Sequence, residues 1–179
     1  MLNQEVILEH ETTGIQIPGG NQVTLPEGSR LYITQMLGGS LTAATDLGLV
    51  RLTREEAARV GIVPEEEGEK LLPSDAPVEE RVWDTLKNIY DPEIPVDIVN
   101  LGLVYGVEAI RQESGLYRVN VKMTLTAPGC GMGPHLMAEA EMRIAALDGV
   151  ENVDVEFVWD PPWNQEMISE EGKMQLGLI

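Results

Sequence analysis

The chain has 179 residues, of which 12 are basic and 30 acidic, giving a formal net charge of −18 at pH 7. Hydrophobic residues make up 43% of it and aromatic residues only 4%, which predicts a folded protein with a mainly aliphatic core. Acidic residues outnumber basic ones in both halves, which argues against binding nucleic acid or an anionic membrane, because both need clustered Lys and Arg. The first residues do not resemble a signal peptide, and no stretch is long enough to span a bilayer. We therefore expect a cytoplasmic protein.

Residues 1–63 are predicted to form a small β-rich domain. Apolar runs at residues 15–17, 23–25, 31–37, 41–45 and 49–52 are separated by Gly, Pro and Asn. Short strands with such turns are typical of a small barrel or of folded hairpins. Thr53 and Glu56 form a capping-box pattern that predicts a short helix, which Gly61 can end. Residues 64–76 are rich in Glu, Pro and Gly and predict a solvated linker.

Residues 77–179 predict an α+β domain with the element order α-β-β-α-β. A helical repeat of apolar residues runs from Val78 to Ile89, and Pro92 requires that helix to end by Tyr90. Two strands joined by a turn at residues 113–115 follow, then a helix from Pro134 and a strand around residues 153–157. This order predicts two layers, with both helices on one face of a small sheet. Asn164 is predicted to cap a last helix that runs through residues 167 and 168 and ends near Gly172 or Gly177.

Cys130 lies in a loop that the sequence places between a strand and a helix. Residues 128–134 contain three glycines and two prolines, which favour an open turn over a buried strand. A cysteine just before a helix N-terminus is favoured as the thiolate, which can act as a nucleophile, a redox sensor or a soft-metal ligand. The alternative is an inert small residue in a turn.

The chain contains few cysteine and histidine side chains that could bind a metal. Cys130 is the only cysteine, and His10 and His135 are the only histidines. The chain therefore cannot form an internal disulfide or a zinc site of four Cys and His ligands. An iron–sulfur cluster usually takes four ligands, mostly thiolates, so here it would need a second subunit, a partner or a small thiol.

Two further segments are candidates for chemistry. Residues 90–100 contain the carboxylates of Asp91, Glu93 and Asp97 and the amide of Asn100, which can bind a hard cation or serve as acid and base. The alternative is that the two aspartates cap turns and Glu93 is solvated. The second segment is residues 159–163, in which Trp159 and Trp163 flank a Pro-Pro pair. The two rings could line a pocket or anchor a partner. The alternative is that they fold the C-terminal tail onto the sheet.

Three runs of the sequence resemble the SufT-type iron–sulfur assembly proteins. They are residues 91–105, 123–134 and 158–164; the ending 167–177 and the N-terminal stretches 17–20 and 33–39 are also similar. The shared domain of that family also occurs in the eukaryotic cytosolic iron–sulfur targeting factors and in PaaD. PaaD-like relatives carry an additional cysteine-rich tail that this chain lacks, which argues against that branch.

The resemblance implies the same α+β fold and an accessory, non-enzymatic role in iron–sulfur protein maturation in the SUF system. By position, the reactive cysteine of the family corresponds to Cys130, flanked by Gly129 and Gly131, and its acidic motif to Asp91, Pro92 and Glu93. We therefore expect a transient cluster that is ligated between molecules, with Cys130, Asp91 and Glu93 as candidate metal ligands. The implied partners are the assembly machinery, apo client proteins and, in one arrangement, a second copy of the chain.

Two other functional hypotheses remain open from the sequence. In the first, the chain is a metal-free adaptor that recruits client proteins, and Cys130 is incidental. In the second, it is a cysteine-dependent enzyme in which Cys130 acts with His135 or Asp91 as the base, which requires hydrogen-bond reach between them. A histidine at the start of a helix is more often a capping or solvated residue, so we rank the enzyme last.

Overall fold

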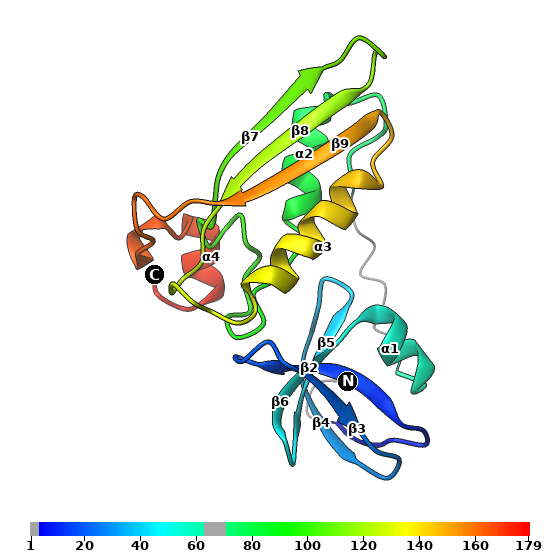
Figure 1. Ribbon diagram of the computed structural model, residues 1–179. Helices are drawn as coiled ribbons and strands as arrows, with labels where there is room; N and C mark the ends of the chain where they lie inside the picture. The colour runs from blue at the N-terminus through cyan, green and yellow to red at the C-terminus, as the bar shows by residue number, and fades with distance from the viewer. Residues whose placement is uncertain (1–3, 63–70) are drawn as a thin grey trace. The chain divides into compact units, whose positions relative to one another are not determined.

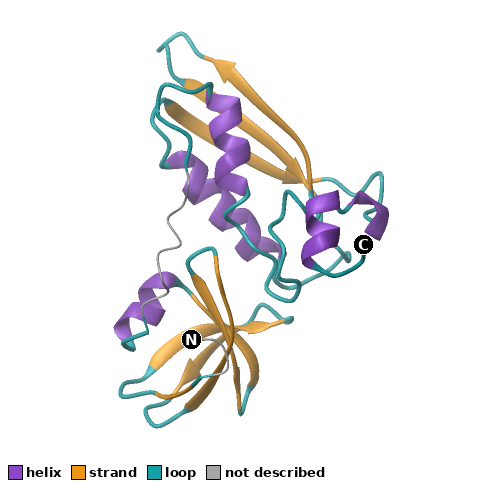
Figure 2. Cartoon of the chain, turned by 180° about the vertical axis from the view of Figure 1, so that it is seen from behind, coloured by secondary structure: helices purple, strands orange, loops and turns teal. Residues whose placement is uncertain are grey.

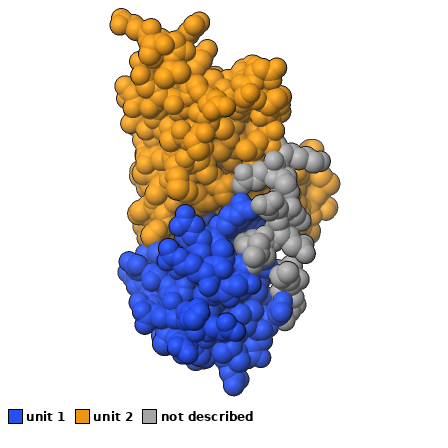
Figure 3. All heavy atoms as spheres, turned by 90° about the vertical axis from the view of Figure 1, so that its right-hand side faces the viewer, with its two compact units in different colours: residues 1–68, 92–95 blue, residues 69–91, 96–179 orange. Residues whose placement is uncertain are grey.

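The computed structural model describes residues 4–62 and 71–179, which divide into two compact units (Figure 3). The first unit contains residues 1–68 and 92–95, and the second contains residues 69–91 and 96–179. The predicted domain boundaries, at residues 63 and 77, stay a prediction. Residues 64–70 of the predicted linker lie outside the described residues. Within the described ranges, no helix combines the length and the apolar character needed to cross a membrane.

The first unit is a six-stranded antiparallel sheet with one short helix (Figure 1). Its strand order is β1-β4-β5-β6-β2-β3. The elements are β1 (Glu5–Ile7), β2 (Thr12–Ile17), β3 (Gln22–Leu25), β4 (Arg30–Leu37), β5 (Ser40–Thr45), β6 (Gly48–Leu52) and α1 (Arg54–Arg59). Five of these strands follow the predicted apolar runs. The sequence analysis missed β1, because three residues are too few to show alternation and its formation depends on pairing with β4.

The core of the first unit is aliphatic, as the composition predicts. In β4, Leu31 and Ile33 point inward and are buried, while Arg30 before them and Tyr32 between them are exposed. This period of two is typical of a strand with one face in water. The core consists of Leu8, Leu25, Leu31, Ile33, Leu41, Ala43, Val50, Leu52, Ala57 and Ile62.

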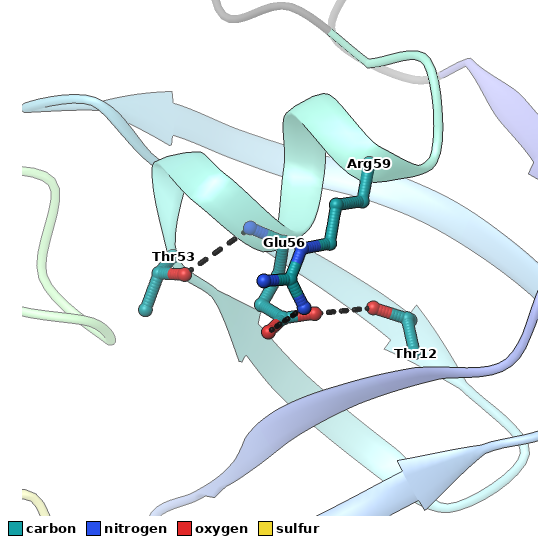
Figure 4. Close-up of polar contacts among 4 residues, drawn as sticks. All are labelled: Thr12, Thr53, Glu56 and Arg59. Carbon is teal, nitrogen blue, oxygen red and sulfur yellow. Dashed lines mark hydrogen bonds and ion pairs between the residues drawn. The ribbon is translucent and has the colours of Figure 1, made fainter.

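Helix α1 begins at the predicted cap and is tied to the sheet by a carboxylate (Figure 4). The Thr53 side-chain oxygen accepts a hydrogen bond from the Glu56 amide at 3.3 Å. The Glu56 carboxylate accepts one from the hydroxyl of Thr12 on β2 at 2.8 Å and pairs with Arg59 at 3.4 Å. Glu56 therefore takes part in both the helix cap, through its amide, and the helix–strand contact, through its carboxylate.

Replacing Thr53 with alanine should loosen α1, because the Glu56 amide loses its capping partner. Loss of an N-cap oxygen typically destabilises a helix by about 1 kcal/mol. Thr53→Ser keeps that oxygen and serves as the control. Hydrogen exchange of α1 amides, followed by mass spectrometry, should be faster in Thr53→Ala alone; equal exchange in both variants would contradict the cap.

The second unit has the predicted order α-β-β-α-β, followed by two short helices. Its elements are α2 (Val78–Leu86), β7 (Val104–Arg111), β8 (Tyr117–Met123), α3 (Gly133–Ala145), β9 (Val150–Phe157), the 3-10 helix η1 (Gln165–Met167) and α4 (Glu170–Gln175). β7 and β8 form an antiparallel hairpin, and β9 pairs parallel to β8 after the α3 crossover. Helices α2 and α3 cover one face of the three-stranded sheet (Figures 1 and 2). The α+β prediction is confirmed.

The core of this unit lies between the helices and the sheet. The helices contribute Val82, Leu86, Leu136, Ala140 and Ile144, and the strands contribute Val119, Val121, Met123 and Val155. Ile89 is also buried, although α2 ends three residues before it.

The predicted single helix after Asn164 is wrong. Asn164 caps only the 3-10 helix η1, because Ile168 takes an extended conformation with ψ of 131°. Ser169 then caps a separate helix, α4, by accepting a hydrogen bond from the Gly172 amide at 3.0 Å. Two caps five residues apart therefore divide this segment.

Candidate functional site

The Cys130 loop joins β8 to α3 and is anchored at both ends. The Thr124 amide donates to the Leu103 carbonyl at 2.7 Å, and the side chains of Leu125 and Met132 are buried. Between these anchors, residues 127–129 are exposed and Cys130 is half-buried with a free thiol. The loop is therefore fixed at both ends and leaves the cysteine accessible between them, as the sequence predicts.

The start of α3 lies directly after the cysteine. The Cys130 carbonyl accepts a hydrogen bond from the Gly133 amide at 3.1 Å, and no side chain caps the helix at Met132. A Cβ atom at Gly133 would lie 2.7 Å from Cδ1 of Leu125 and 3.3 Å from Cζ of Phe157. The absence of a side chain at Gly133 thus allows the helix start to pack against the end of β9.

The acidic segment forms a closed turn of its own. Tyr90 and Asp97 form an antiparallel bridge, and one Asp97 carboxylate oxygen accepts the amides of Val99 and Asn100 at 3.1 and 2.9 Å. The other oxygen accepts the Asn100 side-chain amide at 2.7 Å. Asp97 therefore caps a turn, which was the alternative to a role in metal binding.

The other predicted ligands are placed differently. Asp91 is buried and Glu93 is exposed. Among residues 4–62 and 71–179, no group of three or more His, Cys, Asp and Glu is arranged to hold a metal ion. Cys130, Asp91 and Glu93 do not form such a group within one chain, and their assignment as ligands stays a prediction.

The C-terminal segment, residues 161–172, folds back onto the turn at residues 100–102, and we call it the C-terminal clasp. The Trp163 indole donates to the Leu101 carbonyl at 2.7 Å. Ser169 donates its amide to the Asn100 carbonyl at 2.8 Å and its hydroxyl to the Asn100 side-chain oxygen at 2.6 Å. Trp163 therefore folds the tail onto the domain, which is one of the two interpretations left open for the tryptophans.

The sequence analysis considered folding of the tail onto the sheet but missed the contact between Asn100 and Ser169. Asn100 was considered only as a member of the acidic segment, although its side chain joins Asp97 to Ser169. Asn100 and Ser169 are 69 positions apart, so no local pattern reveals the pair.

Replacing Ser169 with alanine should weaken the clasp, because the change removes both the α4 cap and the bond to Asn100. The expected loss in the free energy of unfolding is about 1–2 kcal/mol. All three tryptophans lie in the second unit, so urea unfolding followed by tryptophan fluorescence reports on it. Ser74→Ala, at an exposed position before α2 in the same unit, should change stability by less than about 0.5 kcal/mol. Equal stability losses in the two variants would contradict the prediction.

Comparison with known proteins places this unit in a family. A family model described as an iron–sulfur cluster assembly protein matches residues 79–156. The chain is 40% identical over 101 residues to the Fe-S protein maturation auxiliary factor YitW of Bacillus subtilis, covering 56% of this chain and 95% of the relative. It is 40% identical over 90 residues to the Fe-S protein maturation auxiliary factor SufT of Staphylococcus aureus, covering 50% of this chain and 98% of the relative.

The chain belongs to the iron–sulfur cluster assembly protein family. The predicted resemblance to SufT-type proteins is confirmed. A crystal structure of a DUF59 domain from Bacillus anthracis is 35% identical and superimposes with a TM-score of 0.51, covering 57% of this chain and 93% of that chain. The family model includes the Cys130 loop, whereas Trp159 and the clasp lie beyond its last matched residue.

Proposed function

We propose that this chain is an accessory factor in iron–sulfur protein maturation that holds a cluster transiently at Cys130 and delivers it to apo-proteins. The observation that carries the proposal is the placement of Cys130: it has a half-buried free thiol, it lies three residues before a 13-residue helix, and it is inside the stretch that the family model matches. The names of the relatives, maturation auxiliary factors, support an accessory rather than an enzymatic role.

The chemistry of the loop suits a cluster that is bound and released. Cys130 has a free, half-buried thiol, and its thiolate is the form that ligates iron. Gly129 and Gly131 place no side chain beside the sulfur that would obstruct a bulky inorganic group. Because a cluster usually takes four ligands and this chain offers one cysteine, the other thiolates come from outside the chain. Asp91 and Glu93 are the additional oxygen ligands in this proposal, and they would act between molecules, because they form no metal-holding group with Cys130 within one chain.

A cluster that is ligated partly by another molecule also indicates the partners of this chain. The remaining ligands would come from the assembly machinery, from the apo client protein or from a second copy of the chain. A cluster held by few bonds to each side can pass to a client that offers a complete ligand set. We propose the cytoplasm as the site of this work, since thiols stay reduced there.

A metal-free adaptor is the second candidate function. It is favoured by the lack of a three-ligand group among the described residues and by the net charge of −18. In this case Cys130 would be incidental, and the acidic surface would steer a basic partner.

Anaerobic reconstitution of the full chain with iron and sulfide separates the two functions. After removal of small thiols, absorbance between about 300 and 600 nm reports thiolate-ligated clusters. Iron and sulfide analysis and native mass then give the stoichiometry. Less than one cluster per chain, in a species of two chains, is the expected result for a carrier that shares its cluster. A colourless monomer would contradict a carrier that shares its cluster between two copies, and it would favour the adaptor.

A further inference from the structure

Trp159 is an exposed aromatic side chain connected by contacts to the Cys130 loop. It follows directly after β9 and is 46% exposed. Its ring stacks on Phe157, with centroids 5.7 Å apart and planes at 30°. Phe157 in turn packs against Gly133, three residues after Cys130. A continuous series of contacts therefore joins the indole to the helix start beside the cysteine.

The backbone on both sides of Trp159 is fixed. The Val158 amide donates to the Met123 carbonyl at 2.8 Å, and the Pro161 carbonyl accepts from the Tyr105 hydroxyl at 2.6 Å. A side chain held in this way loses little conformational freedom when a partner covers it. Trp159 thus has the rigidity that is typical of interface anchors, in which tryptophan is enriched.

The charge of the second unit indicates the chemistry that the indole would bind. Asp160 follows it and is exposed, and residues 74–179 contain 19 acidic side chains against 7 basic ones. The face of an indole attracts Lys and Arg more strongly than the faces of other aromatic rings do. The acidic excess of the unit as a whole favours the same basic partner.

We propose that Trp159 anchors the thiol-bearing partner of Cys130, with a Lys or Arg beside the partner's cysteines stacked on the indole and paired with Asp160. This inference rests on the proposed function, which requires thiolates from a second molecule. An anchor that is joined through Phe157 to the start of α3, three residues after Cys130, would hold those thiolates on the same side of the unit as the cysteine.

The binding test uses a synthetic peptide of about twenty residues that carries a four-cysteine cluster motif flanked by lysines. The reduced, metal-free peptide is titrated calorimetrically into the metal-free full chain. Trp159→Ala should weaken binding about three- to tenfold, the range expected for loss of a cation–π contact. Trp159→Phe should retain part of the affinity, and a glutamate-flanked peptide should bind wild type less tightly than the lysine peptide.

Leu116→Ala is the matched control. Leu116 is 42% exposed and precedes β8, whereas Phe157 pairs with the last residue of that strand, so the control lies at the opposite end of the sheet. Its peptide affinity should equal that of wild type. Equal affinity of Trp159→Ala and wild type, an equal loss in the Leu116 variant, or no binding by wild type would each overturn the anchor.

A second measurement separates this inference from the proposed function. Each variant is loaded with iron and sulfide in the absence of peptide. Trp159→Ala should load as wild type does, while Cys130→Ser should bind peptide but remain unloaded. A joint loss of loading and binding in Trp159→Ala would overturn the anchor, since the ring would then support the loop itself. Wild type that binds peptide through Trp159 but holds no cluster would contradict the carrier function and uphold the anchor.

Discussion

Replacing Cys130 with serine is expected to abolish cluster loading of the full chain. Cys130 is the only cysteine, so no other thiolate of this chain can take over the iron. Soft thiolates are preferred for iron–sulfur clusters, and a neutral hydroxyl is a poor substitute. The absorbance between about 300 and 600 nm and the bound sulfide should both fall to background.

The same substitution should leave the fold intact, which makes the functional result interpretable. Cys130 is half-buried in a loop whose anchors, Leu125 and Met132, are unchanged. The free energy of unfolding should shift by no more than about 0.5 kcal/mol, the usual range for substitutions away from the core. Ser114→Ala, in the distant β7–β8 turn, is the matched control and should load as wild type does. Loading of Cys130→Ser at the wild-type level would eliminate the thiolate from the proposal.

The fold was largely predictable because its signals are local. Alternation in β4 and β8, the helical repeat of α2 and the turn residues between them all depend on neighbours within about ten positions. The prediction failed where structure depends on distant partners. Strand β1 exists through its pairing with β4, and the extended conformation of Ile168 divides a segment that was expected to form one helix.

The candidate site was predictable in its position and not in its surroundings. The glycines and prolines around Cys130 indicated an open loop before a helix, and the structure has that loop. The role of Asp97 could not be settled from spacing, because a turn cap and a cation ligand need the same carboxylate. The contacts of Phe157 with Gly133 and Trp159 depend on how β9 packs against α3, which no sequence pattern describes.

Gly102→Ala is expected to destabilise the second unit strongly. Gly102 has a φ of +78°, where an alanine is strained by about 1–2 kcal/mol. An added Cβ would also lie 2.3 Å from the Met167 carbonyl oxygen in the C-terminal clasp. That atom belongs to the backbone, so the methyl group can be accommodated only if the clasp moves away. The hydrogen bonds from Trp163 and Ser169 would then be lost, and we expect a total loss of about 3–5 kcal/mol in the free energy of unfolding.

Gly115→Ala isolates the contribution of the contact with Met167. Gly115 has a φ of +84° and nothing within 4 Å of an added Cβ, so this variant carries the backbone strain alone. Urea unfolding followed by tryptophan fluorescence should show a loss of about 1–2 kcal/mol for Gly115→Ala and clearly more for Gly102→Ala. Hydrogen exchange should become faster in residues 164–176 in the Gly102 variant only. Equal losses in the two variants would mean that the clasp adapts to a methyl group, and that its attachment to the turn at residues 100–102 contributes little to stability.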